Sequence, residues 1–476
     1  MYYIGYMVRI IATAMTVLIL LVGCGKSEPT ATPVPATATR IALEPTHTPL
    51  PPTATPMPPT PTASPLTATP PSDEPPAISW LSTYGDASNN VGNVVVLADD
   101  GGYFIAGATG LQFEPDPQGD IYLIRTDPAG EILWERTWGG ADYEAGFAMI
   151  RASDGNLVIA GGTSSYGAGE VDMYLLKVDQ NGNEIWSKTF GGTQDDEVVD
   201  VHQTQDGGYI LIGYTRIAGS EGDIEAAGNI GAGESYIYLV KTDGEGNELW
   251  SEVYTGENGE QVYTTAGLPT PDGGFLVLAR INPNANHNTF LLKVDADGNE
   301  AWSRAWETEN LRAGNDIIPT SDGDYLIVGL SEAPDGKGSF MLMKVDPDGN
   351  ELWVNVIDDR RFGYARTAIE LPDRGFVALG FSGRDPLSGL EIFKVDENGQ
   401  LIWTENYASR HLVHGNSILL HPEGDTLITG EADAGGGMDV FLVRLEMTSS
   451  SVPPSTSASP LARCRRPSSP RPWPSW

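Results

Sequence analysis

The chain has 476 residues, of which 40% are hydrophobic, and a formal net charge of −36 at pH 7. This apolar share is enough for a packed core, which excludes a wholly disordered chain. Acidic side chains greatly outnumber basic ones between residues 77 and 447. Such a surface repels phosphate backbones, so we expect no nucleic-acid partner. It suits a soluble body outside the cell, with or without an affinity for cations.

The N-terminus predicts export. Met1–Arg9 precedes the mostly apolar run 10–22, which is too short to span a bilayer but has the length of a signal-peptide core. The run ends in Leu21-Val22-Gly23-Cys24, which resembles the lipobox of bacterial lipoproteins. The resemblance implies removal of residues 1–23 and a lipid on Cys24 that anchors the protein to the bacterial cell membrane. An ordinary cleaved signal and an uncleaved anchor are the alternatives.

Two segments predict little regular structure. Residues 24–76 are dominated by Pro, Thr and Ala, and proline removes backbone donors, so we expect an extended stalk there. The stalk is either a bare spacer or O-glycosylated. The tail 448–476 is rich in Ser, Pro and Arg and is expected to be disordered. The cysteines Cys24 and Cys464 both lie outside 77–447, so no disulfide can form within that region.

An internal repeat dominates residues 77–447. One tryptophan position recurs about every 50 to 64 residues, at Trp80, Trp134, Trp186, Trp250, Trp302, Trp353 and Trp403. Each unit contains four short apolar runs of strand length, separated by turn residues, and none has a helical period. Four strands at this period are typical of a propeller blade. The sequence therefore predicts an all-β fold, a seven-bladed β-propeller of four-stranded blades.

Closure of the ring can be predicted as well. The seventh unit ends at 440–444 without its tryptophan strand, while 78–84 is a spare strand that carries Trp80. We expect 78–84 to pair with 440–444, because closure removes open sheet edges.

Two charged features recur in every unit. Turns such as Asp295–Gly298 contain the residue types that are typical of β-hairpin turns, although a calcium-binding loop is a weaker alternative. A basic residue in the third strand, such as Lys177, precedes an acidic residue by two positions, here Asp179. These side chains share one strand face, so we interpret them as a repeated structural pair, with a ligand-binding ring as the alternative.

The stretch 177–186, Lys-Val-Asp-Gln-Asn-Gly-Asn-Glu-Ile-Trp, resembles the tryptophan-docking motif of quinoprotein-type (PQQ-like) propellers. The resemblance covers Trp80–Glu446 and implies that each tryptophan packs against the neighbouring blade. It extends to the lipid-anchored propeller of outer-membrane protein assembly, which is a scaffold, and to exported bacterial repeat proteins, some labelled endoglucanase. The adjacent cysteine pair of quinoprotein dehydrogenases does not occur in this propeller, so we predict no cofactor, with calcium a weak possibility.

The variable loops indicate where a ligand would bind. Loops between blades, and those between second and third strands, emerge on one face and differ most in sequence. The candidate residues there are acidic in one half and basic in the other: Asp142, Glu144, Asp195, Asp196, Glu197, Arg360, Arg361, His411 and His414. The alternatives are solvated loops without a ligand and, for the two histidines, metal ligation, although we predict no metal site.

No nucleophile elbow, phosphate loop or dinucleotide fingerprint occurs. The sequence therefore favours a monomeric, non-catalytic binding scaffold at the cell surface that holds an unknown protein or glycan on one propeller face. An extracellular polysaccharide-active enzyme or a PQQ-type quinoprotein is the alternative.

Overall fold

The computed structural model describes residues 73–85, 88–112, 118–217, 234–256, 261–281, 288–306, 311–332, 338–357, 363–382, 390–407, 413–433 and 437–447. Cys24, the stalk up to residue 72 and the tail from 448 lie outside the described residues. The part of the chain that is described contains no helix long and apolar enough to cross a membrane.

The described strands form seven antiparallel sheets of four, which confirms the predicted seven-bladed propeller. Blades 1 to 3 consist of β2 (Val91–Leu97), β3 (Tyr103–Gln112), β4 (Gln118–Thr126) and β5 (Ile132–Trp138); β6 (Glu144–Arg151), β7 (Leu157–Thr163), β8 (Asp172–Val178) and β9 (Glu184–Phe190); β10 (Asp196–Gln203), β11 (Tyr209–Ile217), β12 (Glu234–Thr242) and β13 (Glu248–Tyr254).

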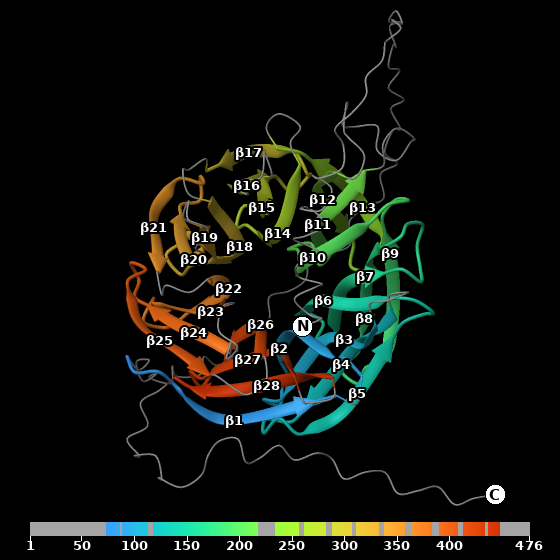
Figure 1. Cartoon of the computed structure of the whole chain (residues 1–476). Coiled ribbons are helices and arrows are strands. Elements are labelled where there is room, and N and C mark those ends of the chain that lie inside the picture. The colour runs from blue at the N-terminus through green and yellow to red at the C-terminus, as the bar shows by residue number, and fades with distance from the viewer. Residues whose placement is uncertain are drawn as a thin grey trace, which may run out of the picture. The chain divides into compact units, whose positions relative to one another are not determined.

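Blades 4 to 7 follow the same pattern around the ring (Figure 1). They consist of β14 (Val262–Pro269), β15 (Phe275–Ile281), β16 (Asn288–Val294) and β17 (Glu300–Ala305); β18 (Leu311–Pro319), β19 (Tyr325–Glu332), β20 (Gly338–Val345) and β21 (Glu351–Ile357); β22 (Gly363–Glu370), β23 (Phe376–Ser382), β24 (Leu390–Val395) and β25 (Leu401–Tyr407); β26 (Val413–Leu420), β27 (Thr426–Asp433), β28 (Met438–Glu446) and β1 (Ala77–Tyr84).

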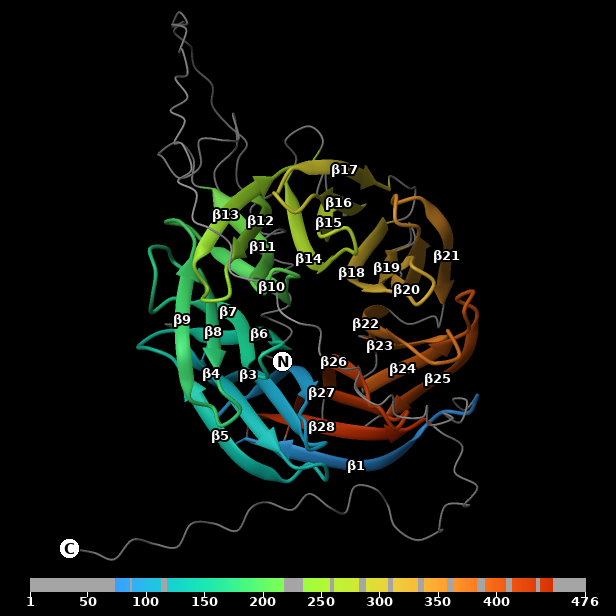
Figure 2. The same ribbon diagram turned by 180° about the vertical axis from the view of Figure 1, so that it is seen from behind.

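Blade 7 combines the two ends of the propeller, as predicted. The first strand, β1, is antiparallel to β28, with a register that runs from Ala77 opposite Glu446 to Tyr84 opposite Val440. Figure 2 shows β1 and β28 side by side at the periphery, seen from behind. The spare N-terminal strand therefore closes the ring.

The propeller begins to make contacts four residues before β1. Pro76 is buried and its carbonyl accepts a hydrogen bond of 2.5 Å from the Tyr407 hydroxyl. Asp73 lies 3.4 Å from Nζ of Lys394, which is fully buried. Residues 73–76 therefore hold to blade 6 and are not a free part of the stalk.

The apolar cores lie between blades, because each sheet buries both faces against neighbours. One cluster joins Val158 and Leu175 of blade 2 to Val201 and Leu211 of blade 3. The cluster at the closure joins Leu427 and Leu442 of blade 7 to residues of blade 1. The remaining clusters join the other neighbouring pairs.

Each repeated tryptophan except Trp403 packs on a turn glycine of the following blade. Gly246 has a φ of +76°, and a Cβ there would lie 2.8 Å from the ring of Trp186. The same ring lies 6.1 Å from that of Tyr209 in blade 3. Trp403 is itself buried, in the cluster between blades 6 and 7. A side chain at Gly246 would thus be strained by the backbone and excluded by the indole.

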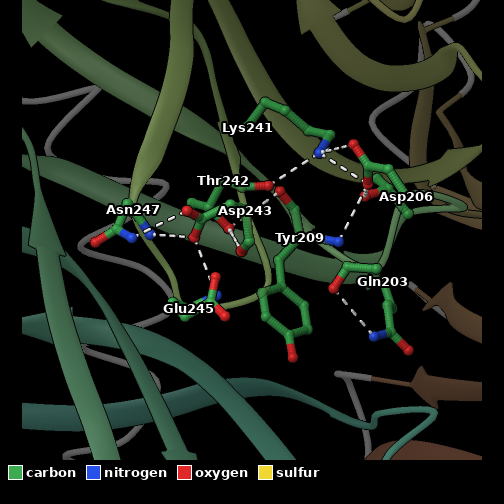
Figure 3. A network of polar contacts seen from close by, with 11 residues as sticks. Gln203, Asp206, Tyr209, Lys241, Thr242, Asp243, Glu245 and Asn247 are labelled. Atoms are coloured by element: carbon green, nitrogen blue, oxygen red, sulfur yellow. Dashed lines mark hydrogen bonds and ion pairs between the residues drawn. The ribbon is translucent and has the colours of Figure 1, made fainter. Parts of the chain in front are cut away.

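The third-strand cations pair differently from the sequence interpretation. Figure 3 shows Nζ of Lys241 directed to Asp206, in the turn between the first two strands of blade 3, at 2.8 Å. Asp243, two residues after Lys241, instead accepts bonds from the amides of Glu245 and Asn247 in the next turn. The ion pair thus joins the third strand of the blade to the turn between its first two strands, which strand alternation alone could not reveal.

The innermost strands are linked by polar side chains at a recurring bulge. The amide of Asn93 in β2 donates to the carbonyl of Gly146 in β6 at 2.8 Å. Asn416 in β26 donates in the same way to Gly92, at 3.0 Å, across the closure. Asn315 repeats the contact between β18 and β22. These bonds fix the innermost strands of neighbouring blades relative to each other.

Deletion of residues 77–85 should destabilise the propeller by more than about 5 kcal/mol, comparable to the stability of a whole domain. The deletion exposes the edge of β28 and one face of blade 7, so aggregation should accompany it. Chemical unfolding and light scattering measure both effects. A deletion within residues 30–70 removes none of the contacts described above and is the control. Equal unfolding midpoints for the two deletions would contradict the closure.

Stability should fall as pH drops from about 4 to about 2. Hydrogen bonds from Lys241, Thr204 and the amide of Gly208 outweigh burial and lower the pKa of Asp206 from 3.8 to about 2. The pKa of Asp322 falls equally, chiefly through Lys344. A lowered folded-state pKa means that the stabilisation is complete above the unfolded-state value and is lost on protonation.

Substitution of Asp206 by alanine isolates this contribution. It leaves Lys241 without its carboxylate, and because Asp206 itself is half exposed we expect a loss of about 1 to 2 kcal/mol at neutral pH and a smaller further loss in acid. Asp348→Ala removes an exposed turn carboxylate and is the matched control, with an effect below about 0.5 kcal/mol. Urea unfolding at several pH values tests this, and identical acid profiles for wild type and Asp206→Ala would refute the pairing.

Candidate binding face

The two ends of the propeller differ in their connections. First and third strands of each blade run one way, and second and fourth strands run back. The loops between blades and between second and third strands therefore share one end, which we call the loop face. The tight turns share the other end, the turn face. Every candidate binding residue that the structure describes belongs to the loop face.

Glu144 lies at the start of β6, where it holds two loops together. Its side chain is fully buried and accepts bonds from the hydroxyl of Thr163 at 2.6 Å and from the amides of Gly140 and Ser165 at 2.6 and 3.1 Å. Both carboxylate oxygens are therefore engaged by the loops on either side of the strand. We call such a residue, whose side chain holds together the loops at the start of the inner strand, the cap of its blade.

Asp196 occupies the same position in blade 3. It accepts a 2.6 Å bond from the amide of Gly192, and Thr215 supplies a hydroxyl bond. Burial raises the pKa of Asp196 to about 6, with smaller contributions from the charges of Asp172 and Asp195. Burial at this depth favours the neutral form of the carboxyl group.

A second carboxylate stands beside each cap. Asp172 accepts 2.8 Å bonds from the amides of Ala168 and Gly169, and burial raises its pKa. A Cβ on Gly191 would lie 2.4 Å from Asp172 and 2.5 Å from Asp196, so only glycine fits between the two. Asp120 and Glu144 flank Gly139 in the same manner. These carboxylates shape the loops.

The other acidic candidates have different surroundings. Asp195 forms an ion pair with Arg216, which lies on β11 of the same blade. Burial is the main reason for a raised pKa of Glu197, which also bonds to Tyr214. Asp142 is exposed, and its backbone amide donates to the hydroxyl of Ser165 at 2.9 Å. Asp142 is thus the candidate most open to a ligand.

The structure does not gather the candidates into one site. Arg360, Arg361 and His411 lie outside the described residues. Nδ1 of His414 lies 3.2 Å from Glu431, and its ring meets that of Phe381 edge-on at 4.8 Å. His414 belongs to blade 7, three blades around the ring from Asp195. Among the described residues, no group of three or more His, Cys, Asp and Glu side chains could hold a metal ion.

A polar cluster on the inner strands was not predicted. His202 of β10 lies 2.7 Å from the carbonyl of Gly267 in blade 4 and 3.3 Å from Asp200. Burial alone would lower the pKa of His202, but the charge and bond of Asp200 raise it. Burial raises the pKa of Asp316 in β18 to about 6. Only the ring brings these blades together, so no local motif could have indicated the cluster.

One pocket of about 460 Å³ opens where blade 7 meets blade 1. Its lining comes from the end of β1, from blade 1 and from the loop between them: Gly85, Asn90, Thr109, Tyr122, Glu135, Arg136 and Thr137. Tyr122 stands opposite Thr137 across β4 and β5, and Asn90 is fully buried. The pocket therefore lies on the loop face, at the closure.

Comparison with known proteins places the chain among repeat propellers. Residues 174–435, more than half of the chain, match the family model described as outer membrane protein assembly factor BamB. The regulatory protein FlaEY of Caulobacter vibrioides is 27% identical over 171 residues, which is 33% of this chain but only 17% of that protein.

Solved structures resemble the chain at low sequence identity. An ulvan lyase of polysaccharide lyase family 25 is 11% identical, with a TM-score of 0.48, over 77% of this chain and 96% of its own. The Pan2 WD40 domain of Neurospora crassa is 10% identical, with a TM-score of 0.46, over 78% and 96%. A protein of unknown function from Dyadobacter fermentans is 13% identical, with a TM-score of 0.42, over 78% and 99%.

Proposed function

This chain belongs to the family described as outer membrane protein assembly factor BamB, and we propose that it is a non-catalytic binding scaffold, held at the bacterial cell surface by a lipid on Cys24. A family described as an assembly factor supports a binding role rather than turnover. The proposed ligand is a protein or glycan on the loop face.

The proposal of a non-catalytic role rests on the hydrogen bonds of the carboxylates at the loop face. Hydrolysis of a glycosidic bond needs two carboxyl groups that face the substrate from either side. Glu144, Asp172 and Asp196 instead accept hydrogen bonds from the amides of their own loops. Their oxygens stabilise the loop conformation, which suits a rigid surface for recognition.

The direction of β1 determines the end of the propeller at which the preceding chain enters it. The strand begins at Ala77, at the turn face, and residues 73–76 hold to blade 6 there through Asp73 and Pro76. A lipid on Cys24 would thus be connected to the turn face.

An assay for turnover and for quinone uptake tests the scaffold. The purified protein is incubated with a panel of polysaccharides and, separately, with PQQ and Ca²⁺ plus an electron-accepting dye. We expect no release of reducing ends, no quinone absorbance on the protein and no dye reduction above a heat-denatured sample. Turnover of any glycan, or a saturable quinone signal, would overturn the proposal in favour of an enzyme.

The anchor has its own test. Cys24→Ala should move the protein from the membrane fraction to the soluble fraction or leave it unprocessed, because the lipid supplies the membrane affinity. Cys464→Ala is the matched control and should stay in the membrane fraction. Fractionation and uptake of labelled palmitate measure the result. Unchanged membrane attachment and labelling of Cys24→Ala would exclude this lipid.

A further inference from the structure

The described residues place one exposed aromatic side chain on the loop face. Tyr166, in the loop between β7 and β8, is 47% exposed. The other exposed large apolar side chains of the described residues, such as Leu133 and Leu249, lie on the outermost strands of their blades. The corresponding residue of blade 1, Gln112, pairs with Gln118 within its sheet and brings no ring. Tyr166 is therefore a feature of blade 2 and not of the repeat.

The ring of Tyr166 is held in place by its neighbours. It stacks on the buried ring of Tyr174, with centroids 6.0 Å apart and planes 22° from parallel. Its hydroxyl donates to the carbonyl of Gly139, in the loop between blades 1 and 2, at 3.0 Å. Its backbone amide donates to the hydroxyl of Thr163 at 3.2 Å. Because Tyr174 covers one face of the ring, the exposed surface of Tyr166 lies mainly on the opposite side.

The two loops that hold this ring are joined to each other. The amide of Asp142 donates to the hydroxyl of Ser165 at 2.9 Å. A Cβ on Gly140 would lie 2.4 Å from Cβ of Ser165, so only glycine lets the loops approach this closely. Both loops lie within the continuously described range 118–217. The ring is thus ordered before a ligand arrives, which reduces the entropic cost of binding.

The carboxyl groups of these two loops are not paired with cations. Asp142 and Glu170 are exposed, and Glu144 is fully buried beside them. Glu144 accepts bonds from neutral donors, the hydroxyl of Thr163 and two backbone amides. In the described part of the chain, none of these three carboxyl groups forms an ion pair with Lys or Arg.

The basic residues of blade 2 that form ion pairs do so at the opposite end of the propeller. Arg151 pairs with Asp99 and Lys177 with Asp154, both in turns of the turn face. Negative charge at the loops around Tyr166 is therefore uncompensated, and the low dielectric constant around a buried carboxylate strengthens its field at the surface. A group that approaches Tyr166 meets an aromatic face in a negative potential.

We propose that Tyr166 and Asp142 bind an arginine side chain on a basic segment of a partner protein, with the guanidinium over the exposed side of the Tyr166 ring and an N–H group donating to the carboxylate of Asp142. The face of an aromatic ring attracts cations, and a planar guanidinium can stack on a ring while its N–H groups bond to a carboxylate. The net charge of −36 favours such a partner at longer range as well. The inference rests on the proposed scaffold function and names the kind of partner that the loop face holds.

The binding test uses the full chain and two peptides of one design. One is acetyl-Gly-Ser-Arg-Ser-Gly-amide, and the other carries citrulline, an uncharged side chain of nearly the same shape, in place of arginine. Ligand-observed NMR should show saturable binding of the arginine peptide, with upfield ring-current shifts of its arginine side-chain protons. The citrulline peptide should bind about fivefold more weakly, because it lacks the charge. Equal binding of the two peptides would overturn the proposal.

Substitutions locate the site, because the whole acidic chain attracts cations and affinity by itself does not. Tyr166→Leu keeps an apolar side chain without an aromatic face and should lower the affinity about three- to fivefold and abolish the upfield shifts. Tyr166→Phe keeps the ring and should bind within about twofold of wild type. Asp142→Asn should lower the affinity by a factor similar to that of Tyr166→Leu.

Leu249→Ala is the matched control, since it removes an exposed apolar side chain from an outermost strand and should leave binding unchanged. Thermal unfolding verifies that each variant is folded. Unchanged affinity in Tyr166→Leu, or an equal loss in Tyr166→Phe and Tyr166→Leu, would show that the face of the ring does not bind the cation.

Two further results would assign the ring to another occupant and overturn the proposal. The first is saturable binding of cellohexaose that Tyr166→Leu abolishes, which would identify a glycan site. The second is binding of the arginine peptide only after removal of residues 448–476, which would show that the arginine-rich tail of this chain occupies the ring.

Failure of this inference differs from failure of the scaffold. The scaffold fails through turnover or quinone uptake, which leave arginine binding unaffected. The inference fails when binding of the arginine peptide does not depend on Tyr166, which leaves a non-catalytic scaffold with another contact surface.

Discussion

A four-stranded blade cannot be stable by itself, because both faces of its sheet are apolar. The core of this propeller consists of clusters that each join two neighbouring blades. Every blade therefore depends on two others, and the chain must supply a partner for the open side of the last blade. Pairing of β1 with β28 supplies it and also removes the free edge of β28. The docking of Trp186 on Gly246, the bulge contacts of the inner strands and the position of each loop all depend on this closed ring.

The polar side chains at the loop face serve first to hold the loops of their own blades. The capping position before each inner strand holds Asn90, Glu144 and Asp196 in blades 1 to 3, and each accepts a bond from a threonine of its own blade. Both amide and carboxylate satisfy the same geometry, so the negative charge is not what the cap requires. Residues that suggested a ligand site by their charge thus serve first to hold the loops. The surface that remains for recognition lies outside these caps, at exposed groups such as Asp142 and at the pocket beside the closure.

Small differences between equivalent positions decide where a repeat protein can bind. Tyr166 and Gln112 correspond, yet one places a phenol over Tyr174 and the other pairs within its sheet. The backbones differ here as well, because β3 and β4 pair out to Gln112 and Gln118, whereas β7 ends at Thr163 and Tyr166 lies in the loop after it. Function in such a fold is therefore confined to the few positions where one blade departs from its neighbours.

The sequence by itself determined the architecture. A tryptophan period of about 50 residues, four strand-length runs in each unit and a spare strand before the first unit specify seven blades and their closure, since period and alternation are local properties of the chain. The tertiary structure decided which side chains interact with each other. Lys241 binds Asp206 rather than Asp243, and His202 lies near Asp316, two blades further around the ring. Pro76 and Asp73, expected in the stalk, hold to blade 6. These residues are distant in sequence, and either the sheet of one blade or the ring of blades brings them near one another.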